Sequence, residues 1–276
     1  MPTFRLFCVT HKPLILPSVR DLIPIQVGTS ESNFCPIRDN QGKTISSKNA
    51  TYSELTAMYS IWKNHPSHFV GFCHYRRFLF PPTLSKWLRS NAVNPYASGF
   101  SLKEDDLVAK LAEVNASYCS DFLPLLEQAD VILPYECTLP KGGFLAQYAS
   151  VHPIGPMYRL LAVLSDIDQR LGLLAHQFFL DQRSAHWCNL FISSWPVFDQ
   201  YSHFLFDVLF RLEDQIVLPR SQYQRRVFAF LSERLFNFWL WMHKIKTCTV
   251  DWAILDTSHL SREPHQFHAS VQKSLL

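Results

Sequence analysis

Short apolar runs that alternate with helical patterns are the feature that most constrains the fold of this chain. Buried strands are predicted at residues 4–10, 22–28, 69–78, 129–135, 185–198 (leading into a turn and helix) and 247–255. Helices are predicted at 51–64, 102–114, 156–180, 198–216 and 224–245, with loops at 29–48, 81–100 and 138–153. This alternation indicates an α/β sandwich, in which ligands bind beyond the carboxyl ends of strands.

The composition suits one large domain. The chain has 276 residues, of which 47% are hydrophobic and 18% charged, so it can bury a sizeable core. We expect a single domain over residues 1–256, followed by a polar tail at 257–276.

The charge and the cysteine content limit which partners and which cellular compartment are expected. The net charge of +3 comes without a basic stripe, which argues against nucleic acid as a partner. None of the seven cysteines forms a CxxC pair, a pattern typical of a reducing compartment. The start "MPTFRLFCVTHKP" has no signal-peptide layout, and no apolar run reaches the roughly 18 residues of a membrane span. A soluble, cytoplasmic protein is expected, with peripheral membrane contact left open.

The stretch "FVGFCHYRRFLF" carries the strongest functional signal. The strand begins with the apolar run 69–73, and Arg76 and Arg77 come after His74 and Tyr75, although an unpaired charge is costly inside a core. At a strand end, two guanidinium groups can grip a diphosphate with paired hydrogen bonds. The alternative is that one arginine forms a structural ion pair and the other faces solvent. His74 is a candidate donor to a phosphate or hydroxyl, or else a hydrogen-bonded core histidine; Tyr75 points to the opposite side.

Polar residues also follow the first strand. Thr10, His11 and Lys12 stand where a nucleotide base and ribose bind in doubly wound sheets, although a plain polar loop is the alternative. The chain has no glycine-rich phosphate loop, which argues against a kinase or a dehydrogenase.

Lys48 and Asn49 precede a predicted helix start, which can bind an anion. Glu54 stands three residues after Thr51, the spacing of a capping box, so a purely structural role is open for it.

Two further pairs are candidates. His186 and Asn189 precede an apolar run and could read sugar hydroxyls or bond to nearby loops. Arg226 and Glu233 share one face of the last helix, where Glu233 is either a general base or part of an ion-pair network. Metal binding has no motif: HExxH and zinc-type Cys/His spacing are both absent from the sequence.

Several strings occur together in one order. They are "VTHK", "IPIQVG", "SSKNATYSELTAMYSIWKN", "VGFCHYRRF", "DVILP", "AHWCNLFI", "FDVLFRLE" and "RVFAFLSERL". In this order they resemble the DUF4422 family of bacterial capsular, exopolysaccharide and O-antigen glycosyltransferases, some of which are linked to galactofuranose transfer. The resemblance covers residues 4 to about 245.

The resemblance implies a GT-A-like, Rossmann-type domain with a mostly parallel central sheet flanked by helices. It also implies a UDP-sugar donor and a lipid-linked or growing glycan acceptor, which would bring the protein to the inner face of the membrane. The usual Asp-x-Asp metal motif of GT-A enzymes is replaced here by the residues 74–77. No cofactor besides the UDP-sugar is expected to be required, and a divalent metal is left open without support from an Asp-x-Asp motif, because the arginines can offset the diphosphate charge.

The resemblance also distributes roles. Asn189 matches a position that contacts donor sugar hydroxyls. Tyr148 and His152 match a "YxxxH" stretch that contacts the donor or the acceptor. Arg226 is also expected to contact the donor or the acceptor. Glu233 is the expected catalytic base, followed by Asp130 and Glu54. A non-catalytic carbohydrate-binding or scaffold subunit, and a sugar-nucleotide hydrolase or phosphotransferase, remain the alternatives.

Overall fold

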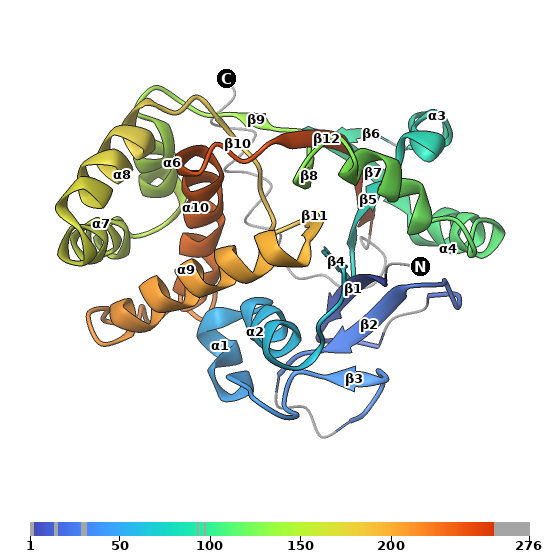
Figure 1. The fold of residues 1–276 in the computed structure, drawn as a ribbon, viewed down its shortest axis with the longest axis horizontal. Coiled ribbons are helices and arrows are strands. Elements are labelled where there is room, and N and C mark those ends of the chain that lie inside the picture. The colour runs from blue at the N-terminus through green and yellow to red at the C-terminus, as the bar shows by residue number, and fades with distance from the viewer. Residues whose placement is uncertain (1–2, 14–15, 29–31, 93, 97, 257–276) are drawn as a thin grey trace.

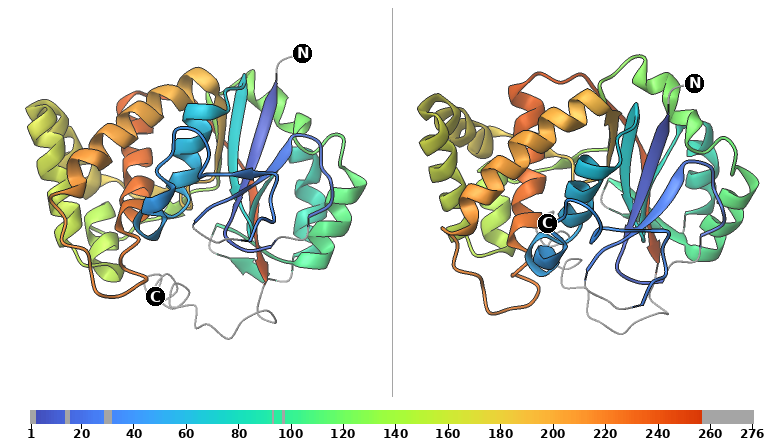
Figure 2. Two further views of the ribbon diagram at one scale, coloured as in Figure 1. Left: turned by 90° about the horizontal axis from the view of Figure 1, so that it is seen from below. Right: turned by 60° about the horizontal axis from the view of Figure 1, so that its bottom comes forward.

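A ten-stranded mixed sheet forms the centre of the molecule, with helices on both faces (Figures 1 and 2). The computed structural model describes residues 3–13, 16–28, 32–92, 94–96 and 98–256. The strands of this sheet are β1 (Phe4–Thr10), β2 (Leu22–Gln26), β3 (Ile37–Arg38), β4 (Phe69–His74), β5 (Arg77–Phe80), β6 (Asn94–Tyr96), β7 (Gly99–Lys103), β8 (Val131–Pro134), β11 (Phe191–Ser194) and β12 (Thr247–Asp256). A separate small sheet pairs β9 (Cys137–Thr138) with β10 (Ser184–Ala185).

The helices lie in two groups on either side of the sheet (Figure 1). One face is covered by α3 (Pro82–Asn91), α4 (Glu104–Glu113), η2 (Ser120–Phe122) and α5 (Leu123–Leu126). The other face carries η1 (Ser46–Lys48), α1 (Asn49–Tyr52), α2 (Leu55–Asn64), α6 (Gly143–Val151), α7 (Gly155–Ile167), α8 (Gln169–Asp181), α9 (Trp195–Glu213) and α10 (Val227–Met242). Successive side chains of β1 serve both cores: Leu6 and Cys8 pack toward α3 and α4, whereas Phe7 and Val9 pack toward α2.

The order of strands is β3-β2-β1-β4-β11-β8-β12-β7-β6, and β5 pairs with both β4 and β12. Because β5 joins these two strands, β4, β5, β12, β8 and β11 close a small ring. Pairings of β1 with β2 and β4 are parallel, but β11 runs antiparallel to β4 and β8, and β5 antiparallel to β12. The α/β class is confirmed, whereas the expected mostly parallel arrangement is not.

The stretch 69–78 is a hairpin and not the single strand that its apolar pattern predicts. The chain turns at Tyr75 and Arg76, and His74 pairs with Arg77 across the turn. The Tyr75 amide donates to the Val9 carbonyl at 3.0 Å, and the Arg76 carbonyl accepts from the Leu255 amide at 2.8 Å. These two bonds hold the arginines at the edge of the sheet where β1 and β4 end.

Three other local predictions are wrong. The range 81–100 contains α3 and the strand β6, and the range 138–153 contains α6, whose glycine-rich start obscured its helical pattern. The capping box is absent, because Ser53 has φ of 50° and ends α1, while the Thr51 hydroxyl donates to the Lys48 carbonyl. The Glu54 side chain is therefore not used as a capping-box partner. The predicted tail at 257–276 lies outside the described residues.

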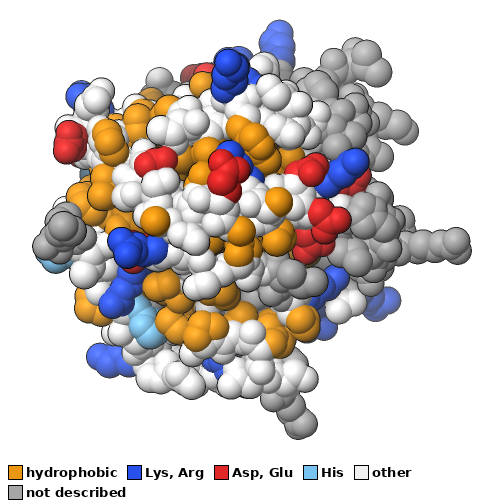
Figure 3. All heavy atoms as spheres, turned by 90° about the vertical axis from the view of Figure 1, so that its right-hand side faces the viewer, with side chains coloured by type: hydrophobic (Ala, Val, Ile, Leu, Met, Phe, Trp, Pro, Cys, Tyr) orange, Lys and Arg blue, Asp and Glu red, His pale blue; other side chains and the backbone are white. Residues whose placement is uncertain are grey.

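The face formed over α3 and α4 shows no concentration of one charge (Figure 3). Lysine, arginine, aspartate and glutamate side chains are interspersed there with apolar ones, in the described part of that face. Within the described ranges, no helix has the length and apolar character to cross a membrane.

Candidate functional site

A cleft of about 740 Å³ opens where β1 and β4 end. Its walls come from these strand ends, from α1 and from the segment between α9 and α10. The described residues that line it are Val9, Thr10, His11, Val27, Asn49, Ala50, Ser53, Glu54, His74, Tyr75, Arg76, Arg77, Arg220, Gln222, Arg225 and Arg226. The carboxyl-end rule for α/β sheets therefore locates this cleft correctly.

The cleft is strongly cationic. Five arginines line it, Arg76, Arg77, Arg220, Arg225 and Arg226. Among the lining residues that the structure describes, Glu54 carries the only carboxylate. Such a surplus of guanidinium groups at a concave surface is suited to a polyanionic ligand of small size.

One end of the cleft carries aromatic and hydroxyl groups. His11 and Tyr75 meet edge to face, with their ring centroids 5.0 Å apart, and the Arg76 guanidinium lies 5.7 Å from the Tyr75 ring. Thr10 closes a tight turn, because its hydroxyl donates to the Lys12 carbonyl and accepts from the Lys12 amide. Lys12 is exposed and does not line the cleft.

Glu54, whose side chain is 10% exposed, and the buried His74 lie at the back of the cleft. Glu54 Oε1 accepts from the Asn189 side-chain amide at 2.8 Å, and Oε2 lies 3.9 Å from Arg226 Nη2. Burial alone would raise the pKa of Glu54, but Arg226, the Asn189 bond and, when it is protonated, His74 together lower it. Burial lowers the pKa of His74 to about 4. His74 is therefore neutral at pH 7, and Arg226 is the charge that keeps Glu54 ionised there.

A smaller cavity of about 80 Å³ continues the cleft toward α10 and adds a second carboxylate, Glu233. Glu233 Oε1 accepts from the Cys188 amide at 2.9 Å, and Oε2 accepts from Arg234 at 2.9 Å. Burial raises the pKa of Glu233 in spite of Arg234, and the nearby Glu54 adds to this rise. Two carboxylates whose pKa values move in opposite directions are suited to acid–base work at one site.

Asn189 supports this site without lining either cavity. It is 3% exposed, and its amide nitrogen donates to Glu54 and, at 3.0 Å, to the Ser232 hydroxyl. Its φ of 49° and that of Cys188, 73°, turn the chain sharply before β11. The burial of Asn189 does not support the expected contact with the donor sugar, and its side chain bonds to Glu54 instead.

Tyr148 lies on α6 and His152 directly follows this helix; neither residue lines the cleft or the smaller cavity. The His152 ring stacks on Phe230 at 4.0 Å and its Nδ1 bonds to Gln224, while the Tyr148 ring lies 5.1 Å from the Arg234 guanidinium. Both are buried, so direct contact with donor or acceptor does not fit their position. Tyr148 packs against Arg234, which bonds to Glu233, whereas His152 packs against Phe230 at the start of α10.

Three predicted residues are separated from the cleft. The Lys48 ammonium bonds to both carboxylate oxygens of Glu213 and lies outside the lining. His186 lines another pocket. Asp130 is exposed at the start of β8, at the opposite edge of the sheet from the end of β4, where it accepts from the Lys246 amide. This position separates Asp130 from the residues of the cleft and does not support its expected role as a catalytic base.

Sequence reasoning missed Arg220 and Gln222. Both come from the segment between α9 and α10, which has no regular pattern. The string "PRSQYQRR" directly before a helix was the available signal, since it concentrates basic residues in a turn-forming stretch.

The residues of the cleft do not fit a divalent cation. Oxygen ligands are what such ions require, but Glu54 is surrounded by arginines that repel a cation. Elsewhere in the described ranges, no three histidine, cysteine, aspartate or glutamate side chains gather as metal ligands.

Comparisons with known proteins agree with this architecture. No curated protein matches the sequence. Among solved structures, the apo structure of WbbM, a bifunctional glycosyltransferase, superposes with a TM-score of 0.78 at 23% identity. The match covers 92% of this chain and 46% of that one, so the chain spans less than half of that protein, and the likeness concerns the fold. The family model described as a domain of unknown function, DUF4422, matches residues 5–244. The chain belongs to the DUF4422 family.

Proposed function

We propose that this chain is a glycosyltransferase that moves a sugar from a UDP-sugar to a lipid-linked or growing glycan. The observation that carries the proposal is the arginine-lined cleft at the carboxyl ends of β1 and β4. A nucleotide diphosphate is the anion that this cleft suits, because paired guanidinium groups bind adjacent phosphates in a fixed geometry.

The fold supports the same reaction class. WbbM, whose fold this chain shares, is a bifunctional glycosyltransferase. The family resemblance favours a GT-A-like donor site and makes galactofuranose one candidate for the transferred sugar. Capsule, O-antigen or exopolysaccharide synthesis is the matching setting, and a cytoplasmic protein at the inner membrane face would meet both the donor and a lipid-linked acceptor there.

Each group of the cleft has a distinct task in this proposal. Thr10, His11, Tyr75 and Asn49 surround the nucleoside end, and Arg76 and Arg77 hold the diphosphate, with Arg220, Arg225 and Arg226 closing over it. Since no metal fits the site, these charges take the place of a cation in stabilising the leaving group.

The chemistry breaks one bond and forms another. An acceptor hydroxyl attacks the anomeric carbon of the donor as the bond from that carbon to the diphosphate oxygen breaks. The hydroxyl proton goes to Glu233, whose raised pKa suits a general base, and the electron pair stays on the diphosphate beside Arg76 and Arg77. Glu54, ionised by Arg226, orients the reacting groups.

The test is a panel of nucleotide sugars assayed with and without an acceptor glycan and with and without EDTA. Transfer to the acceptor that persists in EDTA is the expected result. Release of free sugar alone would replace the proposal with a hydrolase. Binding of UDP without any turnover of the panel would favour a scaffold subunit. Absence of UDP binding would contradict the proposal that the cleft binds a nucleotide diphosphate.

A further inference from the structure

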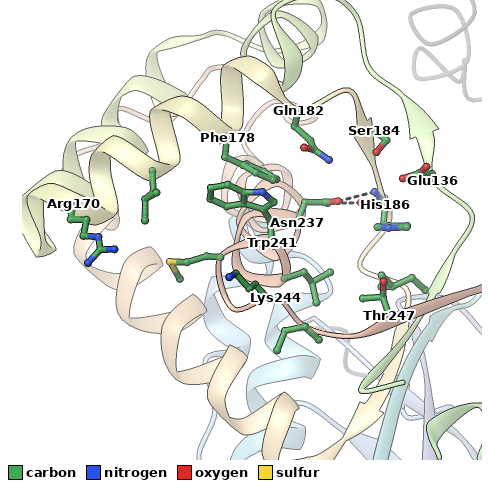
Figure 4. Close-up of a pocket in the computed structure, with 15 residues that line it drawn as sticks. Glu136, Arg170, Phe178, Gln182, Ser184, His186, Asn237, Trp241, Lys244 and Thr247 are labelled. Atoms are coloured by element: carbon green, nitrogen blue, oxygen red, sulfur yellow. Dashed lines mark hydrogen bonds between the residues drawn. The ribbon is translucent and has the colours of Figure 1, made fainter. Parts of the chain in front are cut away.

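A second pocket, of about 650 Å³, lies at the other end of α10 (Figure 4). It opens between α8, the end of α10 and the strands β8, β10 and β12. Along α10, Arg226 and Trp241 are 15 positions apart, which corresponds to about 22 Å at ~1.5 Å per residue. The two pockets share no lining residue, and the donor cleft proposed above does not use this one.

An aromatic surface forms the middle of the pocket. Trp241 is 42% exposed, which is unusual for so large an apolar side chain in this structure. Phe178 and Phe238 pack against its indole, with ring centroids 5.3 and 6.2 Å away. Because the Trp241 ring is already held in place, it loses little side-chain entropy when a ligand stacks on it.

One wall of the pocket is polar. Glu136, Gln182, Ser184 and His186 lie on this side (Figure 4). The His186 Nδ1 atom lies 2.8 Å from the Pro134 carbonyl, which can only accept, so Nδ1 carries the proton. Burial lowers the pKa of His186, so the ring is neutral and Nε2 remains an acceptor. The wall thus combines acceptors with the donors of Gln182 and Ser184.

His186 is also held rigidly in place. Its amide donates to Asn237 Oδ1 at 2.9 Å, and its carbonyl accepts from Asn237 Nδ2 at 2.8 Å. Two residues further on, the Cys188 amide bonds to Glu233. The polar wall and the proposed base are therefore attached to the same short segment, 186–188, along α10.

From this combination we infer that the pocket binds a glycan, with one sugar ring stacked on Trp241 and its hydroxyls bonded to the wall around His186. A sugar has an apolar face and a polar edge, as the pocket does. A lipid chain would leave the wall of Glu136, Gln182 and Ser184 without water or partners, at a cost in free energy. That the glycan is a distal part of the acceptor rests on the proposed function; that the pocket binds sugar does not.

The experiment is saturation-transfer NMR on the full chain with methyl glycosides of galactose, glucose, mannose, rhamnose and N-acetylglucosamine, without donor. We expect millimolar binding of at least one of them. Trp241→Ala should weaken it at least tenfold, and Trp241→Phe less. The matched control is Tyr158→Ala, because Tyr158 is an aromatic residue of α7 that is 58% exposed and lines neither pocket. Circular dichroism of each variant reports on folding, and UDP titration reports on the donor cleft.

Loss of glycoside binding in Trp241→Ala with UDP binding retained supports the inference. If Trp241→Ala does not fold, Gln182→Ala takes its place with the same expectation. Two results would overturn the inference. One is the absence of glycoside binding at millimolar glycoside in 20-fold molar excess over protein, and the other is glycoside binding that neither Trp241→Ala nor Gln182→Ala changes. So would Trp241-dependent binding to phosphatidylglycerol vesicles without glycoside binding. A chain that binds glycosides but not UDP would retain this site and contradict the proposed function.

Discussion

Glu54 and Asn189 are joined by a hydrogen bond of 2.8 Å across 135 positions of sequence. Glu54 follows the break between α1 and α2, and Asn189 lies in the left-handed turn before β11. Because Asn189 also bonds to Ser232, the cleft wall formed by α1 and Glu54 is connected to α10. It fixes a carboxylate between Arg226 and the cavity that holds Glu233.

Replacing either arginine of the β4–β5 turn should strongly reduce transfer. Arg76→Ala and Arg77→Ala should each lower kcat/KM about 10²–10³-fold, the loss expected when one preorganised electrostatic stabiliser is removed. UDP affinity, measured by calorimetry, should also fall. Arg159→Ala on α7 is the control, since this exposed arginine is outside the cleft. Full activity in both turn variants would contradict the diphosphate assignment.

Glu233→Gln should lower kcat about 10²–10⁴-fold, the typical contribution of a general base, while UDP binding stays intact. Glutamine retains an oxygen that can accept from the Cys188 amide, so the local fold is kept. Steady-state kinetics with saturating donor provide the measurement. Glu127→Gln, on an exposed position, serves as the control. An unchanged kcat would remove Glu233 from the mechanism.

Asn189→Asp should move the acid limb of the pH–rate profile to higher pH. The substitution replaces a donor to Glu54 with a second carboxylate, which raises the pKa of Glu54, and aspartate tolerates the left-handed backbone. A purely structural role for Asn189 would lower stability without moving the profile. Asn91→Asp, at the exposed end of α3, is the matched control and should leave the profile in place.

The protein should lose stability between pH 7 and pH 5. Burial lowers the pKa of His152 to about 4, from an ordinary value of 6.5. Below pH 6.5 the unfolded chain binds a proton at this residue that the folded chain does not, so the free energy of unfolding falls as pH decreases toward 4. This residue alone should account for about 2 kcal/mol between pH 7 and 5. Urea unfolding at the two pH values should show a smaller difference in His152→Gln. The exposed His176→Gln should retain the wild-type difference, and an equal difference in all three proteins would refute the explanation.

Gly71→Ala should destabilise the central sheet by about 1–3 kcal/mol, as overpacking does. A Cβ there would lie 2.7 Å from Ile192 Cγ1 and 2.8 Å from Leu6 Cδ1. Gly155→Ala is the matched control, because nothing lies within 4 Å of its added Cβ. Urea unfolding should show a neutral or slightly stabilising effect at residue 155, since alanine restricts the unfolded chain. Equal effects at the two positions would contradict the packing argument.

Local pattern predicted much of the fold. The strands β1, β4 and β8 lie within the predicted apolar runs, and β12 extends one residue past its run. Helices cover most of 156–180, 198–216 and 224–245. The failures have local causes. The glycines and prolines at the start of α6 and α3 led to loop predictions for both helices. Apolar residues on both sides of Tyr75 and Arg76 gave a hairpin the pattern of a single strand.

The sequence by itself determined the α/β class, the polar groups at the ends of β1 and β4, and the concentration of arginines in two short strings. Those properties depend on residues close together in the chain, whose periodicity and order are visible in the letters. Only the tertiary structure decided that Glu54, Arg226 and Glu233 share one site while Asp130 and His186 do not. The physical reason is that a break at Ser53, a hairpin at Tyr75 and the packing of α10 against α1 set distances between residues far apart in the chain.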